Sequence, residues 1–168
     1  MITVRVLQES DAEDVRRVRL QAIQEHPEAF GASYDEDASL DISVWQDRLR
    51  NGLPNNVSFG AFIDDELVGI CHLGRYNRMK SHHRFALTGM YMASTARGQG
   101  AGQALVEAAI AYARELGDVE QIILAVTVGN DPAKRLYERT GFTTWGLDRH
   151  YLKIDGHYFD LEWMTLDL

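Results

Sequence analysis

The chain has 168 residues, of which 45% are hydrophobic, and a formal net charge of -8. This length fits one domain, and the acidic balance argues against nucleic acid as a partner because phosphate binding needs a basic surface. The charge favours cationic or neutral substrates, although solubility alone explains it equally well.

The composition also bears on location. No apolar run approaches the roughly 18 residues that a membrane-spanning helix needs, so no membrane partner is expected. Residues 1–7 lack the long apolar core of a signal peptide, and the single cysteine, Cys71, allows no internal disulfide. We therefore expect a cytoplasmic protein.

The first quarter of the chain predicts a strand, a helix and an irregular segment. The strand covers residues 3–7. The helix begins with a capping box of Ser10 and Glu13 and ends at Pro27. The acidic stretch Glu28–Ser39 shows no periodicity, so we expect it to be irregular.

A short helix near Asp41 precedes a run of antiparallel strands. Val57–Ile63 and Leu67–Tyr76 flank a polar turn and predict a hairpin. A further strand covers His83–Met92. The remaining elements alternate helix and strand and end in a second hairpin: a helix over 101–117, a strand at Ile122–Val128, a helix from Asp131 to Gly141, and strands at Leu147–Ile154 and His157–Leu166.

The order of these elements predicts the fold class. Antiparallel strands come first, and a single strand–helix–strand crossover follows, which should be parallel and right-handed. We therefore expect an α/β (α+β) fold with one mixed, mostly antiparallel central sheet and helices on both of its faces. One domain should cover residues 1–168.

The run Arg97–Gly102 (RGQGAG) lies between a predicted strand and a predicted helix. Its glycines let the backbone approach a ligand closely, and N–H groups at a helix N-terminus attract anions such as a pyrophosphate. A nucleotide-binding P-loop is excluded because no Gly-Lys-Ser/Thr follows. A Rossmann oxidoreductase is a near match, but the glycine spacing differs and the chain offers one crossover where that fold needs several.

Two motifs carry a resemblance to a known family. The stretch Met90–Gly102 (MYMASTARGQGAG) is similar to the acetyl-CoA signature of the GNAT acetyltransferase superfamily, Arg/Gln-x-x-Gly-x-Gly/Ala. Asn130–Phe142 (NDPAKRLYERTGF) resembles the distal motif of the same superfamily, at the expected separation. The element order fits that fold over nearly the whole chain. His26–Gly31, together with Trp45, is similar to a bacterial subgroup whose substrates are mostly unassigned.

The resemblance implies acetyl-CoA as the co-substrate. Its pantetheine arm should lie between the strands His83–Met92 and Ile122–Val128, which diverge in this fold. Its pyrophosphate should rest on the N–H groups of the glycine loop. Asn130 contacts the co-substrate in the family, although a residue before a helix also suits a local cap. The implied binding residues are Met90, Tyr91, Met92, Arg97, Gly98, Gln99, Gly100, Ala101, Gly102, Gln103 and Asn130.

The implied activity is acetyl transfer to a primary amine of a small molecule or a protein, by direct attack on the thioester. A backbone N–H near Met92 would bind the developing oxyanion. Tyr137 would act as the general acid at the leaving thiolate, because a phenol is protonated at neutral pH. Its helical spacing alone indicates a core residue, and the two roles are compatible. A non-catalytic acyl-CoA-binding sensor or interaction module is the alternative.

The general base is where the chain departs from this family. The two positions at which members place a glutamate are Ala86 and Ala125 here. The base is then elsewhere, a water chain, or unnecessary. His72, His82 and His83 titrate in the useful range, and His83 is the best placed because it begins the strand before the glycine loop. No histidine–carboxylate spacing suggests a metal site.

The acceptor site should be built from three segments: Glu28–Ser39, the loop Arg75–His82 and the final hairpin. Asp160 and Glu162 point to one side of the last strand. There they would orient a cationic amine, or simply face solvent. The edge strands of the hairpin also allow a homodimer.

Overall fold

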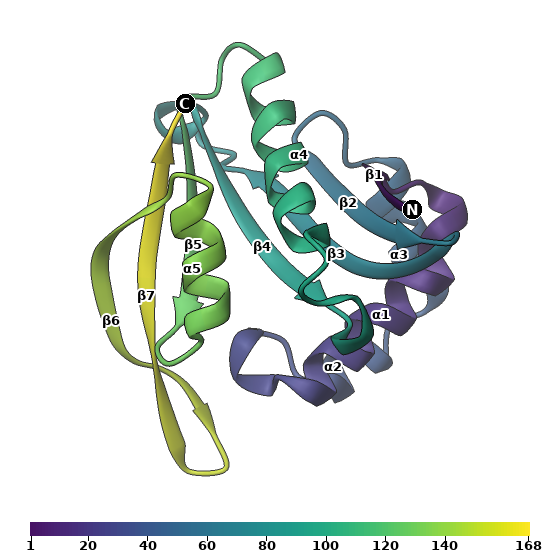
Figure 1. Ribbon diagram of the computed structural model, residues 1–168, viewed down its shortest axis with the longest axis horizontal. Coiled ribbons are helices and arrows are strands. Elements are labelled where there is room, and N and C mark those ends of the chain that lie inside the picture. Colours follow the sequence, from purple (N-terminus) through teal and green to yellow (C-terminus); the bar gives the residue numbers. More distant parts are fainter.

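A computed structural model describes residues 1–168 and contains one seven-stranded sheet in the order β1-β2-β3-β4-β5-β7-β6 (Figure 1). All neighbouring strands are antiparallel except β4 and β5, which are parallel. The sheet therefore confirms the predicted mixed, mostly antiparallel class. The strands are β1 (Ile2–Val6), β2 (Asn56–Ile63), β3 (Glu66–Arg75), β4 (Arg84–Met92), β5 (Gln121–Thr127), β6 (Thr143–Ile154) and β7 (His157–Asp167).

Helices cover both faces of the sheet, as the element order predicts. α4 and α5 lie over the larger buried cluster, and α1 and α3 lie over a second cluster that contains Val18 and Trp45. None of the helices has the length and apolarity needed to cross a membrane. The helices are α1 (Ala12–Glu25), α2 (Tyr34–Ala38), α3 (Ile42–Arg50), α4 (Ala101–Glu115) and α5 (Asp131–Arg139), with short 3-10 turns at Glu9–Asp11, Pro27–Ala29, Met79–Ser81 and Ser94–Ala96.

The parallel pair separates soon after it forms. β4 and β5 are paired only over Arg84–Ala86 and Gln121–Ile123. Beyond these residues β4 pairs with β3 alone, and the register shifts between Ile70 and His72 of β3. Gly89, with a positive φ of 62°, lies in this irregular stretch of β4. We call the diverging part of β4 and β5 the splay. Figure 1 shows it opening toward the loops that lead into α4 and α5.

Alternation along the strands decides which side chains reach which face. Phe85 and Leu87 of β4 belong to the buried cluster under α4. Ala86 and Thr88, one residue out of step, line a cavity on the face that α1 covers. The same alternation places the successive residues of β5 and β7 on opposite faces of the sheet. It therefore decides which carboxylates of β7 can reach the site.

The packing under α4 gives a direct test of the core. Leu105 is fully buried in the larger cluster. We expect Leu105→Ala to lower the free energy of unfolding by about 2–5 kcal/mol, because it removes buried methyl groups and leaves a cavity. Urea denaturation measures this as a lower midpoint with an unchanged slope. Leu147→Ala is the matched control, since Leu147 is half exposed and should change stability by less than about 0.5 kcal/mol. Equal losses in the two variants would contradict this packing.

Two local predictions near the N-terminus are wrong. The first helix does not begin with a capping box of Ser10 and Glu13, because a 3-10 turn occupies residues 9–11 and α1 begins at Ala12. The carboxylate of Asp11 accepts the backbone N–H of Gln8 at 2.7 Å instead.

The stretch Glu28–Ser39 is not irregular throughout. It contains α2, which begins after a capping box. Glu36 accepts the backbone N–H of Ser33 at 2.7 Å, and the Ser33 hydroxyl accepts the N–H of Glu36 at 3.3 Å. This helix has only five residues, too few for hydrophobic periodicity to reveal it.

Candidate active site

The glycine loop ends in an open helix N-terminus. Gly98 and Gly100 have positive φ values of 76° and 84°, and Gly100 is the residue that caps α4. A Cβ built on either glycine meets no atom within 4 Å, so the space in front of this loop is free. The first intrahelical bond runs from Ala104 N–H to the Gly100 carbonyl at 3.0 Å. The N–H groups of residues 101–103 are therefore left for an anion.

The backbone of β4 beside this loop has one unpaired edge. Tyr91 and Met92 pair with β3 on one side, while no strand pairs with them on the side that faces β5. Their side chains are occupied elsewhere. The Tyr91 hydroxyl donates to Glu25 at 2.7 Å, and burial, followed by this hydrogen bond, raises the pKa of Tyr91. An extended ligand in the splay would thus meet backbone, as the sequence predicts.

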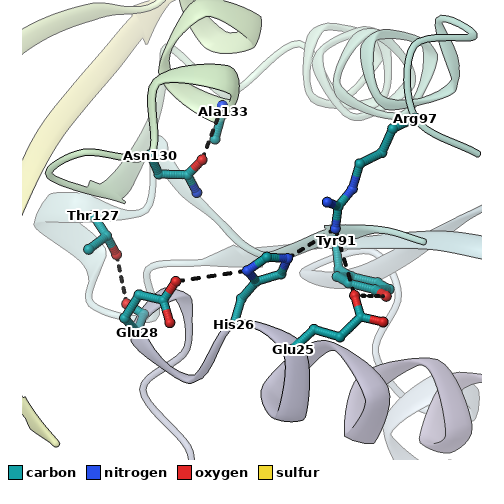
Figure 2. Close-up of polar contacts among 8 residues, drawn as sticks. All are labelled: Glu25, His26, Glu28, Tyr91, Arg97, Thr127, Asn130 and Ala133. Carbon is teal, nitrogen blue, oxygen red and sulfur yellow. Dashed lines mark hydrogen bonds and ion pairs between the residues drawn. The ribbon is translucent and has the colours of Figure 1, made fainter. Parts of the chain in front are cut away.

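Arg97 has a different environment from the rest of the glycine loop. Its guanidinium turns back from the loop and donates from Nε to the carbonyl of Met92 at 3.0 Å. Its Nη2 lies 3.0 Å from Nε2 of His26 and 3.7 Å from the carboxylate of Glu25 (Figure 2). The side chain thereby ties the end of β4 to the end of α1, which leaves only the backbone of Arg97 to face a pyrophosphate.

Asn130 caps α5. Its side-chain oxygen accepts the backbone N–H of Ala133 at 3.4 Å, so Asn130 is the local cap that its place before the helix suits (Figure 2). The cap engages only the oxygen, so the two amide hydrogens of Asn130 remain available to a ligand. The capping role and the predicted ligand contact are therefore compatible.

Tyr137 lies in the core beneath the splay. It is 6% exposed, and its ring packs edge-on against Phe142 with centroids 6.0 Å apart. Burial raises the pKa of the phenol, and the nearby Cys71 thiol of β3 adds to the rise. The hydroxyl has no hydrogen-bond partner within the protein, yet it is not among the fully covered polar atoms that lack one. The phenol is therefore fully protonated at any working pH and free to donate.

A cavity of about 300 Å³ lies at the splay on the face that α1 covers. The side chains of Phe30 and Trp163 form much of its apolar wall, and Glu28 supplies its one carboxylate. A larger cavity of about 650 Å³ lies beneath α1 and α3, and the two share Arg19, Thr88 and Gly89 as lining residues. The site thus has an open helix N-terminus on one side of the splay and a cavity on the other.

This arrangement agrees with what the chain is similar to. Residues 19–142 match the Acetyltransferase (GNAT) family. The chain belongs to this family. It is 28% identical to the L-amino acid N-acetyltransferase AaaT of Escherichia coli, over 98% of this chain and 96% of that protein.

Solved structures share the GNAT fold with this chain. A GNAT-family acetyltransferase from Streptococcus pneumoniae superimposes with a TM-score of 0.90 at 20% identity, covering 100% of this chain and 99% of its own. The Salmonella typhimurium protein yncA, solved with its cofactor acetyl-CoA, gives a TM-score of 0.87 at 19% identity, with coverage of 100% and 94%. The chain is an acetyltransferase of a family that uses acetyl-CoA.

Within this GNAT chain, the two alanines at the family's glutamate positions both line the smaller cavity. Ala86 reaches it from β4 and Ala125 from β5. The strands therefore present methyl groups where other members present a carboxylate.

His83 lies directly before the first residue of β4, close to its predicted place at the start of that strand, but this position does not make it a base in the splay. His83 lies at the closed end of the parallel pair, where its carbonyl accepts the N–H groups of Glu120 and Gln121, so it is not in the splay. His82 lies 3.0 Å from Arg75, at the same distant end. Strand direction explains the error, because parallel strands that pair at their beginnings diverge at their other ends.

His72 alone of these three histidines borders a cavity, the larger one. Its Nδ1 lies 3.0 Å from the Ser58 hydroxyl. Burial, followed by the positive charges of Arg19 and Arg48, lowers the pKa of His72. The imidazole is therefore neutral near neutral pH.

Asp160 and Glu162 do not line the smaller cavity. Glu162 pairs with Val126 of β5, on the face that α5 covers, and its carboxylate lies 2.7 Å from the ammonium of Lys134. The Asp160 carboxylate accepts the backbone N–H of His150 at 2.8 Å. Both groups already have partners inside the protein, so the predicted role in orienting a cationic amine is not supported.

The sequence predicts Glu28 as the first residue of the acceptor segment Glu28–Ser39, but it does not predict that residues 25–28 cross the open end of the splay. We call residues 25–28 the strap. Glu25 and His26 contact Arg97, which follows β4, while the carbonyl of Glu28 accepts the hydroxyl of Thr127 in β5 at 2.7 Å (Figure 2). The similarity of His26–Gly31 to a subgroup of the family was the available signal, but no spacing rule connects it to β5.

Proposed function

We propose that this acetyltransferase moves the acetyl group of acetyl-CoA to a primary amine of a small molecule or a protein, by direct attack on the thioester. One observation carries the proposal: the unpaired edge of β4 runs from the smaller cavity to the open N-terminus of α4. A ligand with an extended arm and a pyrophosphate fits that edge and that helix end together. The relative AaaT, named for L-amino acids, supports an amine acceptor.

The proposed binding roles follow from these positions. The backbone of Met90, Tyr91 and Met92 would hold the pantetheine arm, and a backbone N–H near Met92 would bind the oxyanion. The N–H groups from Gly98 to Gln103 would hold the pyrophosphate, and the free amide of Asn130 would contact the arm. The guanidinium of Arg97 would act indirectly, since it fixes the carbonyl of Met92.

Tyr137 would supply the proton that the leaving thiolate needs. Its helix places the ring on the α4 side of the splay, close enough to Cys71 of β3 for the thiol to affect the pKa of the phenol. A hydroxyl that is protonated and without a protein partner is suited to donate to sulfur.

Thiol release tests this function directly. Acetyl-CoA is incubated with the protein and a panel of L-amino acids, a peptide with a free α-amine, and spermidine, and free thiol is followed over time. We expect amine-dependent release with at least one member of the panel. Acetyl-CoA binding without thiol release for any amine would favour the alternative of a non-catalytic acyl-CoA-binding sensor. The absence of the family's glutamates at Ala86 and Ala125 is the reason for testing that alternative.

A further inference from the structure

We propose that Glu28, on the strap, is the general base that takes a proton from the acceptor amine. It would replace the strand glutamate whose two family positions are Ala86 and Ala125 in this chain. This inference rests on the proposed amine acetylation and names a catalytic residue for it.

The position of Glu28 carries the first step. It is the only carboxylate that lines the smaller cavity, which both Ala86 and Ala125 also line. Its carbonyl accepts the hydroxyl of Thr127 at 2.7 Å. Thr127 follows Ala125 by two residues and so shares its face of β5. The strap thus brings the backbone of Glu28 to the same face of the same strand, one side-chain step nearer the open end of the splay.

The strap is held at several points, which fixes the backbone that carries Glu28. Pro27 begins a 3-10 turn immediately after His26, and Phe30 is buried at 6% exposure. Arg97 binds His26 from the β4 side while Thr127 binds Glu28 from the β5 side (Figure 2). A base held by both diverging strands stays aligned with a substrate that lies between them.

His26 is the positioning residue for this base. The guanidinium of Arg97 can only donate hydrogen bonds, so Nε2 of His26, 3.0 Å away, accepts in the neutral imidazole. The proton of that imidazole is then on Nδ1, which lies 3.8 Å from a carboxylate oxygen of Glu28. The partial positive charge of an N–H at this nitrogen attracts that carboxylate oxygen and orients it. The second carboxylate oxygen of Glu28 has no partner in the protein and is free to receive a proton.

Acetyl transfer from the thioester to an ammonium substrate releases one proton. An ammonium group loses one proton to Glu28, which passes it to solvent because its side chain is 36% exposed. The neutral amine then forms the C–N bond to the thioester carbon. When the C–S bond breaks, the thiolate takes a proton from Tyr137, and the second proton lost by the nitrogen restores the phenol. The products are the acetamide, free coenzyme A thiol and one proton released to solvent.

The test uses Glu28→Gln, which keeps the size and polarity of the side chain but removes the base. With the best amine of the panel, we expect kcat to fall about 10²- to 10³-fold. The variant has no group to deprotonate an ammonium, so its rate should follow the fraction of amine that is already neutral in solution. The wild-type rate should depend on that fraction less steeply. Acetyl-CoA affinity, measured by calorimetry, should change less than about threefold, and Glu28→Asp should recover part of kcat.

Glu115→Gln is the matched control, because Glu115 is an exposed carboxylate at the far end of α4. It should leave kcat and the pH profile unchanged. A Glu28→Gln variant with wild-type kcat and pH profile would overturn the base role while amine acetylation stands. Loss of acetyl-CoA affinity in step with kcat would also overturn it, because the strap would then be purely structural. A wild type that releases no thiol with any amine would contradict both proposals.

Discussion

Replacing Tyr137 with phenylalanine is expected to lower kcat about 10²- to 10³-fold, the usual contribution of a positioned acid. The affinity for acetyl-CoA should change less than about threefold, because the proposed binding contacts are backbone groups on other elements. The free energy of unfolding should also stay close to the wild-type value. The ring that packs on Phe142 remains, and the missing hydroxyl makes no hydrogen bond within the protein.

A second tyrosine on the same side of the sheet provides the control. Tyr112 of α4 donates its hydroxyl to the carbonyl of Pro54 at 3.0 Å, near the end of the helix that is distant from the glycine loop. Tyr112→Phe should leave kcat unchanged. Steady-state thiol release and acetyl-CoA calorimetry on both variants separate the two outcomes. Full turnover in Tyr137→Phe would assign its phenol to packing alone and leave the thiolate to be protonated by water.

The pH dependence of Tyr137 also follows from its burial. The raised pKa means that the phenol does not ionise in the range where enzymes are assayed. Any fall in activity at alkaline pH would then come from another group. The same shift makes the phenol a weak acid, so its hydrogen bond to sulfur strengthens as negative charge develops there and the proton is transferred only when the C–S bond breaks.

Prediction from the sequence is most accurate where a residue's own chemistry determines the local backbone conformation. The turn at Asp155–Gly156 occurs as expected, with positive φ values of 47° and 82°. The glycine loop likewise places Gly98 and Gly100 in the left-handed region before α4. Such features depend on local sterics, and tertiary packing only has to agree with them.

Side-chain partners are harder to predict, because they depend on which elements the fold brings together. Alternation shows that Asp160 and Glu162 share a side of β7, but the strand order β5-β7-β6 decides that this side faces α5. Arg97 is a similar case. Its motif specifies backbone conformation, whereas its long side chain reaches His26, which is 71 residues earlier in the chain.

The strap illustrates what a single sequence leaves undetermined. Glu28 lies 99 residues before Thr127, and no periodicity joins a short 3-10 turn to the end of a distant strand. The sequence is equally incomplete about Ala86 and Ala125, the positions at which the family's glutamates are absent. Their identities are read directly from the sequence, but the residue that replaces them becomes visible only when the cavity is assembled.

Replacing Gly100 with alanine is expected to weaken acetyl-CoA binding about 30-fold or more. Gly100 has a φ of 84°, and an L-residue in the left-handed region costs about 1–2 kcal/mol. The free loop of the variant relieves this strain by leaving that conformation, and acetyl-CoA must restore it on binding, which is a factor of about 5–30. The new methyl group meets no protein atom within 4 Å. It therefore projects into the open space where the pyrophosphate would approach the N-terminus of α4, and this adds to the loss.

Calorimetry with two ligands separates an effect of Gly100→Ala on the glycine loop from an effect on the rest of the binding site. Acetyl-CoA carries the pyrophosphate, whereas acetyl-pantetheine carries only the arm and the thioester. Gly100→Ala should weaken the first and leave the second nearly unchanged, because the edge of β4 is intact. Gly146→Ala is the control, since its Cβ also meets nothing within 4 Å and its φ lies outside the left-handed region. Equal weakening for both ligands would contradict an anion site at this helix end and would indicate instead that the substitution disturbs the splay as a whole.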